Sequence, residues 1–188
     1  MNAPSRIEDL TVDKLLASAI ARTDGLSHFG DDNYRASLQA LLDALASEAG
    51  LSQTGLHLLE ERLVGQLVNR LVMEDYLSRY PEITRIEIDD PLVIVGLPRT
   101  GTTMLQRTLA VDPRFYCAAW WETRFPAPLA GETLAAPAKR IAQAKAEVDL
   151  MAEVIPQILA IHPLDALLCD EEFMLMEHSF MCAMDAYV

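Results

Sequence analysis

Apolar residues in the first part of the chain recur three and four positions apart, the spacing of one face of an α-helix. A first set lies in residues 11–22. A second set follows Asp32, a residue type that favours helix starts. A third runs over residues 54–79 and is stopped by Pro81. These patterns predict a helical N-terminal region over residues 1–82.

The pattern changes in the second region, residues 83–188. Residues 83–88 alternate imperfectly, which suggests a short edge strand. Four consecutive apolar residues at 92–95 favour a strand buried on both faces, as in a parallel sheet. A helical pattern follows at 102–111, and a parallel sheet needs a second strand after such a crossover, for which we assign 115–121. We therefore predict an α/β fold: a partial P-loop-type parallel sheet with flanking helices, preceded by the helical N-terminal region.

Helical patterns return toward the C-terminus. Residues 136–159 form a long one that Pro156 interrupts, and residues 170–187 form a final amphipathic one. Only one or two core strands are visible, whereas a doubly wound sheet has about five or more. Because the chain stops inside a helical pattern at Val188, we expect it to be the first part of a larger domain.

Composition and charge narrow the class of protein. With 51% hydrophobic and 23% charged residues, the chain has the profile of a folded globular protein. The net charge of −13 argues against a nucleic-acid partner, since phosphate contacts need many Lys and Arg. No apolar stretch approaches the roughly 20 residues of a membrane span. The scattered cysteines Cys117, Cys169 and Cys182 predict neither a disulfide framework nor a metal site, and favour a reducing, cytoplasmic location.

The turn after the apolar run at 92–95 carries the strongest chemical signal. Gly96 and Gly101 have the G-x-x-x-x-G spacing of a phosphate-binding P-loop, but Thr102 stands where such a loop has Lys. The nearest cation is Arg99, whose guanidinium can hold two oxygens of an anion at once. A turn of this kind directs backbone N–H groups and the helix dipole toward one point. The loop therefore predicts a site for a phosphate-like anion.

The same segment argues against a magnesium-dependent nucleotide site. A loop for a nucleoside triphosphate pairs Lys with a Ser or Thr that binds Mg²⁺, and a later Asp helps to hold the metal. Here the loop Lys is absent and no apolar strand ending in Asp follows. We expect metal-free binding, with the hydroxyls of Thr102 and Thr103 as additional donors. An ordinary glycine-rich turn between a strand and a helix is the alternative.

At this point the residues resemble a family. LPRTGTT at residues 97–103 resembles the 5′-phosphosulfate-binding loop of sulfotransferases, in the Arg form of the tyrosylprotein sulfotransferase and bacterial branch. DPRF at 112–115 and WWETR at 120–124 are similar to the segments that follow the loop in that branch. The resemblance is strong over about residues 90–130 and weak elsewhere. It implies a sulfotransferase that uses 3′-phosphoadenosine 5′-phosphosulfate and no metal.

The resemblance also implies residue roles. The 5′-phosphosulfate would be held by Pro98, Arg99, Thr100, Gly101, Thr102 and Thr103. As catalytic residues, Arg99 would neutralise the sulfuryl group and the leaving phosphate, and Glu122 would take the acceptor's proton. Arg124 and Trp121 would contact the acceptor, a small molecule or peptide with a hydroxyl or, less favoured, an amine.

Each assignment has a structural alternative. Glu122 suits a helix start, Arg124 a solvated surface and Trp121 a core or pocket wall. His162 and His178 are candidate bases, but core or surface positions are the preferred explanation for both. The carboxylates Asp170, Glu171 and Glu172 begin a helical pattern, where the helix dipole favours negative charge.

Two other functions remain open at this stage. One is a P-loop enzyme on another phosphorylated ligand, such as a kinase-like protein. The other is a non-catalytic interaction protein that keeps a vestigial anion loop. In the sulfotransferase family, an Arg and a Ser near a later Arg-Asp-Pro run bind the donor's 3′-phosphate, and no segment after residue 130 matches them. The sequence therefore predicts only half of the donor site.

Overall fold

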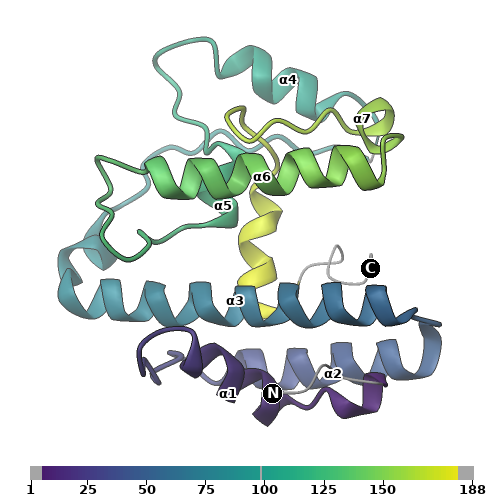
Figure 1. Cartoon of the computed structure of the whole chain (residues 1–188). Coiled ribbons are helices and arrows are strands. Elements are labelled where there is room, and N and C mark those ends of the chain that lie inside the picture. The colour runs from purple at the N-terminus through teal and green to yellow at the C-terminus, as the bar shows by residue number, and fades with distance from the viewer. Residues whose placement is uncertain (1–5, 98, 182–188) are drawn as a thin grey trace. The chain divides into compact units, whose positions relative to one another are not determined.

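A computed structural model describes residues 6–97 and 99–181 of the chain. Its described residues form two compact units (Figure 1). One contains the residues up to Pro81 together with those from Phe173 onward, and the other is Glu82–Glu172. The domain boundary that the sequence predicts between residues 82 and 83 stays a prediction.

The first unit is helical, as its apolar spacing predicts. Helix α1 (Val12–Ala21) packs along the long helix α3 (Gln53–Arg79), and α2 (Asn33–Glu48) contacts α1 (Figure 1). Thr11 starts α1, because its hydroxyl accepts from the Lys14 N–H at 3.4 Å. Asp32 occupies the capping position of α2, but its side chain makes no capping hydrogen bond and pairs with Arg35 at 3.1 Å. The short 3₁₀ helix η1 (Ile7–Asp9) precedes α1.

The leucines of these helices build one continuous core. Leu63 and Leu67 of α3 are at most 1% exposed, and α1 packs along that helix. Burial of this kind contributes about 1.5–3 kcal/mol for each large apolar side chain. Fully buried members of the core include Tyr34, Leu15, Leu38, Leu59, Leu63, Leu67, Leu71 and Val64.

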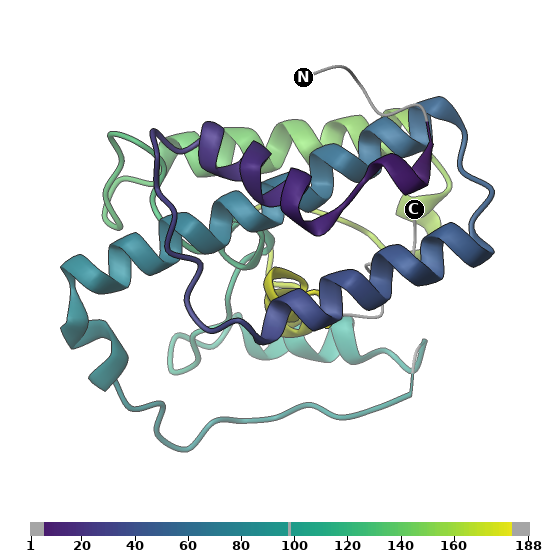
Figure 2. The ribbon, with the colours of Figure 1, turned by 90° about the horizontal axis from the view of Figure 1, so that it is seen from below.

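A polar cluster fastens the 3₁₀ helix η3 (Glu172–Ser179) to the middle of α3 (Figure 2). The buried Glu177 carboxylate accepts from Arg62 at 2.9 Å and from Gln66 at 3.3 Å. Arg70 donates to the carbonyl of Asp31 at 2.8 Å, and it also donates to the carbonyl of His178 at 3.3 Å. These pairs satisfy polar groups that would otherwise be buried at a cost.

The second unit combines helices with long connecting segments. Its helices are α4 (Thr102–Leu109), α5 (Trp120–Arg124), α6 (Ala138–Val154) and α7 (Ile158–Ile161), and the 3₁₀ helix η2 (Pro81–Arg85) stands at its start. Helix α5 packs against α6. Near that contact, Arg140 and Glu132 form an ion pair at 3.2 Å in which both side chains are 3% exposed.

The predicted α/β fold is wrong for the chain as the structure describes it. The described residues are helical and contain no sheet. The β-type backbone pairing among these residues consists of two isolated antiparallel bridges, Ala119 with Cys169 and Thr133 with Ala136. Residues 92–95 are extended, but Val93 is 72% and Val95 87% exposed. A strand forms only when a neighbour pairs with its N–H and C=O groups, and the described residues supply no such partner for this run.

Other predicted elements also changed. The expected edge strand at 83–88 is largely replaced by η2, and the expected strand at 115–121 is mostly irregular before it enters α5. The helical pattern at 136–159 becomes α6 and α7, separated around Pro156 as its missing N–H requires. The final pattern at 170–187 forms η3 in its first part, and its end lies outside the described residues. No helix within the described ranges is long and apolar enough to span a membrane.

Candidate functional site

The loop between residue 96 and α4 is folded tightly on itself. Gly101 is the N-cap of α4 with a φ of 89°, a conformation that glycine adopts without strain. A Cβ on Gly96 would lie 2.8 Å from the Thr102 Cγ2 and 2.9 Å from the Thr100 Oγ1. The Thr100 hydroxyl donates to the carbonyl of Leu97 at 2.6 Å. The close approach of two threonine side chains at Gly96 and the positive φ of Gly101 therefore favour glycine at both positions of the predicted P-loop. Pro98 lies outside the described residues.

Arg99 differs from the arginines that follow it. Its backbone has a φ of 65°, in the left-handed region that costs a non-glycine residue about 1–3 kcal/mol. The residue is exposed, and within the described ranges no carboxylate pairs with it. By contrast, ion pairs join Arg107 to Asp170, Arg114 to Asp112 and Arg124 to Glu147. In the part of the chain described, Arg99 is therefore the loop cation whose charge is not already matched by a carboxylate.

One face of α4 contacts an acidic segment, residues 170–172. Thr103 donates its hydroxyl proton to the Glu171 carboxylate at 3.3 Å. Gln106 donates to the carbonyl of Asp170 and to the Glu172 carboxylate, both at 3.0 Å. Residues three positions apart on a helix share a face. The Glu171 carboxylate consequently lies beside the first turn of α4, next to the predicted anion loop.

Arg107, one turn after Thr103, adds to the same attachment. Its guanidinium donates to the carbonyl of Cys169 at 3.1 Å and to that of Pro163 at 2.9 Å. It also lies 3.8 Å from the Asp170 carboxylate, which is buried and meets the His162 Nε2 at 3.0 Å. This arrangement was not predicted from the sequence, although the spacing of Thr103, Gln106 and Arg107 on one helical pattern was a signal for a polar face.

Glu122 caps the start of α5. One carboxylate oxygen accepts from the Ala119 N–H and the other from the Tyr116 hydroxyl, both at 2.7 Å. Burial, followed by the Glu122 contact, raises the pKa of Tyr116 to about 12. No hydrogen bond joins Glu122 to residues 96–103 among those described. The helix-start role is thus present in the structure, and the catalytic role stays a prediction.

The two predicted acceptor residues lie near α6. Arg124 donates to the Glu147 carboxylate of α6 at 2.9 Å. The Arg140 guanidinium lies over the Trp121 ring at 5.0 Å from its centroid. Burial opposes ionisation of Glu132, but N–H donors of Arg140, Leu129 and Lys139 outweigh it and hold the pKa of this carboxyl below its usual value. Trp121 is therefore packed against a buried, firmly hydrogen-bonded ion pair, and its contact with an acceptor stays a prediction.

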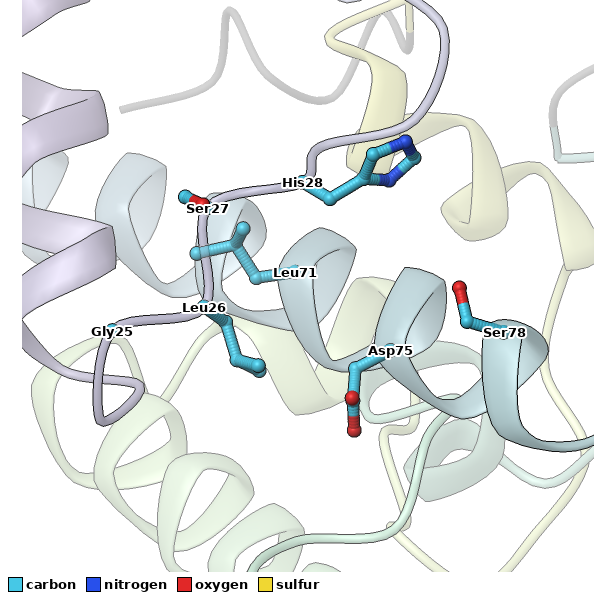
Figure 3. A pocket seen from close by; sticks show the side chains of 7 residues that line it. All are labelled: Gly25, Leu26, Ser27, His28, Leu71, Asp75 and Ser78. Atoms are coloured by element: carbon cyan, nitrogen blue, oxygen red, sulfur yellow. The ribbon is translucent and has the colours of Figure 1, made fainter.

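A small surface pocket lies in the first unit (Figure 3). Its volume is about 250 Å³, and the loop after α1 lines it together with the C-terminal half of α3. The lining includes Leu26, His28, Leu71 and Asp75, and none of the predicted site residues. The pocket therefore adds nothing to the predicted anion site.

Among the residues described, no cluster of three His, Cys, Asp or Glu side chains has the arrangement of a metal site. Burial and the neighbouring Cys169 raise the pKa of Cys117 to about 12. Both thiols are free, and a raised pKa keeps the thiol of Cys117 protonated and poorly reactive. Cys182 lies outside the described residues.

The segment that begins just before the tight loop also matches a known family. The model of the sulfotransferase family, Sulfotransfer_3, matches residues 91–188. The chain belongs to the sulfotransferase family.

Two solved structures resemble the chain. Sulfotransferase STF1 from Mycobacterium tuberculosis H37Rv is 32% identical with a TM-score of 0.71, over 96% of this chain and 50% of that protein. Sulfotransferase STF9 from Mycobacterium avium is 25% identical with a TM-score of 0.75, over 93% of this chain and 45% of that protein. The chain thus spans about half the length of the solved relatives it matches. No curated protein sequence matches it.

Proposed function

We propose that the chain binds the 5′-phosphosulfate of 3′-phosphoadenosine 5′-phosphosulfate in the loop 96–103 and takes part in sulfuryl transfer to an acceptor hydroxyl. The conformation and charge of this loop carry the proposal. Gly101 has a left-handed backbone conformation at the N-cap of α4. The exposed Arg99 has no carboxylate partner within the described residues. N–H groups at a helix start together with an unmatched guanidinium favour a doubly charged ligand. Membership of the sulfotransferase family supports a phosphosulfate over a nucleoside triphosphate.

The transfer step assigns a distinct task to each group. The acceptor oxygen attacks sulfur, a new S–O bond forms, and the S–O bond to the 5′-phosphate breaks with its electron pair on the phosphate oxygen. Arg99 stabilises the charge on the sulfuryl and leaving oxygens, as electrostatic stabilisation of a loose transition state requires. A carboxylate takes the acceptor's proton, a contribution of about 10²–10⁴-fold.

Two carboxylates compete for the role of base. Glu122 follows the family resemblance, but its two oxygens already accept hydrogen bonds from Ala119 and Tyr116. Glu171 shares a hydrogen bond with Thr103 on the first turn of α4. Because a base must lie within reach of the reacting hydroxyl, the position beside the loop favours Glu171 as a second candidate.

Donor binding is tested with adenosine 5′-phosphosulfate, which has the 5′-phosphosulfate of the donor but not its 3′-phosphate. Added without Mg²⁺, it should shift the amide NMR signals of Gly101, Thr102 and Thr103, and Arg99→Ala should weaken binding about tenfold or more. Arg114→Ala is the matched control, since its guanidinium is already paired with Asp112. A response only to Mg-ATP would contradict the proposal and favour the kinase-like alternative.

Transfer of labelled sulfate to a panel of hydroxyl compounds then separates the two bases. Loss of the base should reduce the rate about 10²–10⁴-fold in either Glu122→Gln or Glu171→Gln. Glu153→Gln, an exposed carboxylate of α6, should leave the rate unchanged. Equal rates in all three variants would contradict both assignments, and donor binding without transfer to any acceptor would favour the interaction-protein alternative.

A further inference from the structure

Polar contacts join residues 163–172 to α4. Residues 163–170 are held to this helix by Arg107, whose guanidinium contacts two carbonyls, and by Gln106, whose amide contacts a third. A carbonyl of an irregular segment needs a partner when it is buried, and the hydrogen bond from Gln106 to the Asp170 carbonyl is buried. Here these partners come from consecutive residues of the helix whose N-terminus forms the predicted anion loop.

Asp170 lies at the centre of this attachment and is 1% exposed. One of its carboxylate oxygens meets the His162 Nε2 at 3.0 Å, and the Arg107 Nη2 lies 3.8 Å from the same oxygen. The other oxygen accepts from the Glu171 N–H at 2.8 Å. A buried carboxylate is costly unless it is paired and hydrogen-bonded. Asp170 therefore depends on Arg107 and His162, and it in turn orients the backbone of Glu171.

We propose that Arg107, Asp170 and His162 are positioning residues that hold the Glu171 carboxylate beside the first turn of α4, with His162 tightening the network when it is protonated. This inference rests on the proposed function, since it concerns the alignment of a candidate base with the phosphosulfate loop. Misplacement of a reacting group by about 1 Å can reduce a rate about 10²-fold. The network is therefore expected to act on the transfer rate, with a much smaller effect on donor affinity.

The charges that face His162 are Asp170, Glu171 and Arg107. The hydrogen bond to Asp170 raises the pKa of His162 above its ordinary value of 6.5, burial opposes the shift, and Arg107 also lowers it. Below this raised pKa the ring is charged and attracts Asp170. As the pH rises through it, the attraction weakens and the hold on Glu171 loosens. The transfer rate should therefore fall over that pH range.

The first measurement does not depend on sulfuryl-transfer activity. An NMR titration of the His162 ring in the full chain should give a lower pKa in Asp170→Asn than in the parent, with His162→Gln used for assignment. Hydrogen exchange at the Glu171 amide should become faster in Asp170→Ala, which removes its acceptor. An unchanged His162 pKa in Asp170→Asn would overturn the network, whatever the activity.

The positioning role is tested by separating kcat from KM. Arg107→Lys keeps the positive charge but loses the planar guanidinium that can contact two carbonyls at once. Asp170→Asn keeps the shape of the side chain but loses its negative charge. Both should lower kcat about tenfold or more with less than about a twofold change in the donor's KM, whereas Arg114→Lys should change neither. The fall in rate with rising pH should disappear in His162→Gln.

Each outcome decides a different point. Parent-like kcat in Arg107→Lys and Asp170→Asn would overturn the positioning role even with a shifted His162 pKa. If the parent neither binds adenosine 5′-phosphosulfate nor transfers sulfate, the proposed function fails and the catalytic consequence with it. The His162 titration still decides in that case whether the network exists.

Discussion

The two compact units differ in how far they bury their apolar side chains. In the first unit, helices α1, α2 and α3 bury one continuous set of leucines against one another. In the second unit, apolar side chains around the loop stay exposed, including Val95 at 87%, Val111 at 82% and Met104 at 72%. Away from the loop this unit does bury some apolar side chains, such as Trp120 and Phe125. At α4 the attachment includes hydrogen bonds from Arg107 to the carbonyls of Cys169 and Pro163.

This difference follows from the range of the interactions. The apolar faces of α1, α2 and α3 find one another within the first eighty residues, and most of a helix's stability comes from such packing. An extended run needs a hydrogen-bonding neighbour along its whole length, which residues 92–95 lack in the described structure. The loop region is therefore held by specific polar contacts, which are individually more vulnerable to substitution than a large leucine core.

The largest expected effect concerns the buried ion pair of the second unit. Glu132→Ala leaves Arg140 buried without its carboxylate and removes the acceptor of three backbone N–H groups. Breaking one partner of such a pair should lower the free energy of unfolding by about 3–5 kcal/mol. Both tryptophans, Trp120 and Trp121, lie in this unit, so urea unfolding followed by tryptophan fluorescence reports on it. Glu153→Ala, at an exposed site, should change the value by less than about 0.5 kcal/mol, and equal losses would contradict the interpretation.

A core substitution in the first unit should come next in size. Leu67 is completely buried on α3, so Leu67→Ala should cost about 2–5 kcal/mol through lost burial and the cavity left behind. Urea unfolding followed by far-UV circular dichroism measures the loss. Leu58 lies on the same helix but is 53% exposed, and Leu58→Ala should have a far smaller effect. Similar losses for the two leucines would argue against the core described for this unit.

The smallest effect is expected in the extended run itself. Because Val95 is 87% exposed, Val95→Thr should change the free energy of unfolding by less than about 0.5 kcal/mol. The same urea measurement with tryptophan fluorescence checks it. A loss above about 2 kcal/mol would instead place this residue in a packed interior and contradict the contrast between the units.

The candidate site shows the same division between local and distant information. The loop from Gly96 to Thr103 was found because its glycines, threonines and Arg99 are neighbours in the sequence and meet local backbone requirements. Glu171 was read only as a helix-start carboxylate, since its contact with Thr103 joins residues 68 positions apart. The helix-start position of Glu122 could also be predicted locally, because its capping contacts reach back only three and six positions. Its catalytic role stays a prediction.

By itself, the sequence determined the N-terminal helices, the tight loop that begins α4 and the family, because each depends on residues close together in the chain. Only the tertiary structure decided that residues 92–95 have no strand partner among the described residues, that Arg107 and Asp170 join α4 to the acidic segment, and that Glu171 lies beside the loop. The physical reason is that strand pairing and buried ion pairs are made between distant segments. No local pattern specifies which distant residues meet.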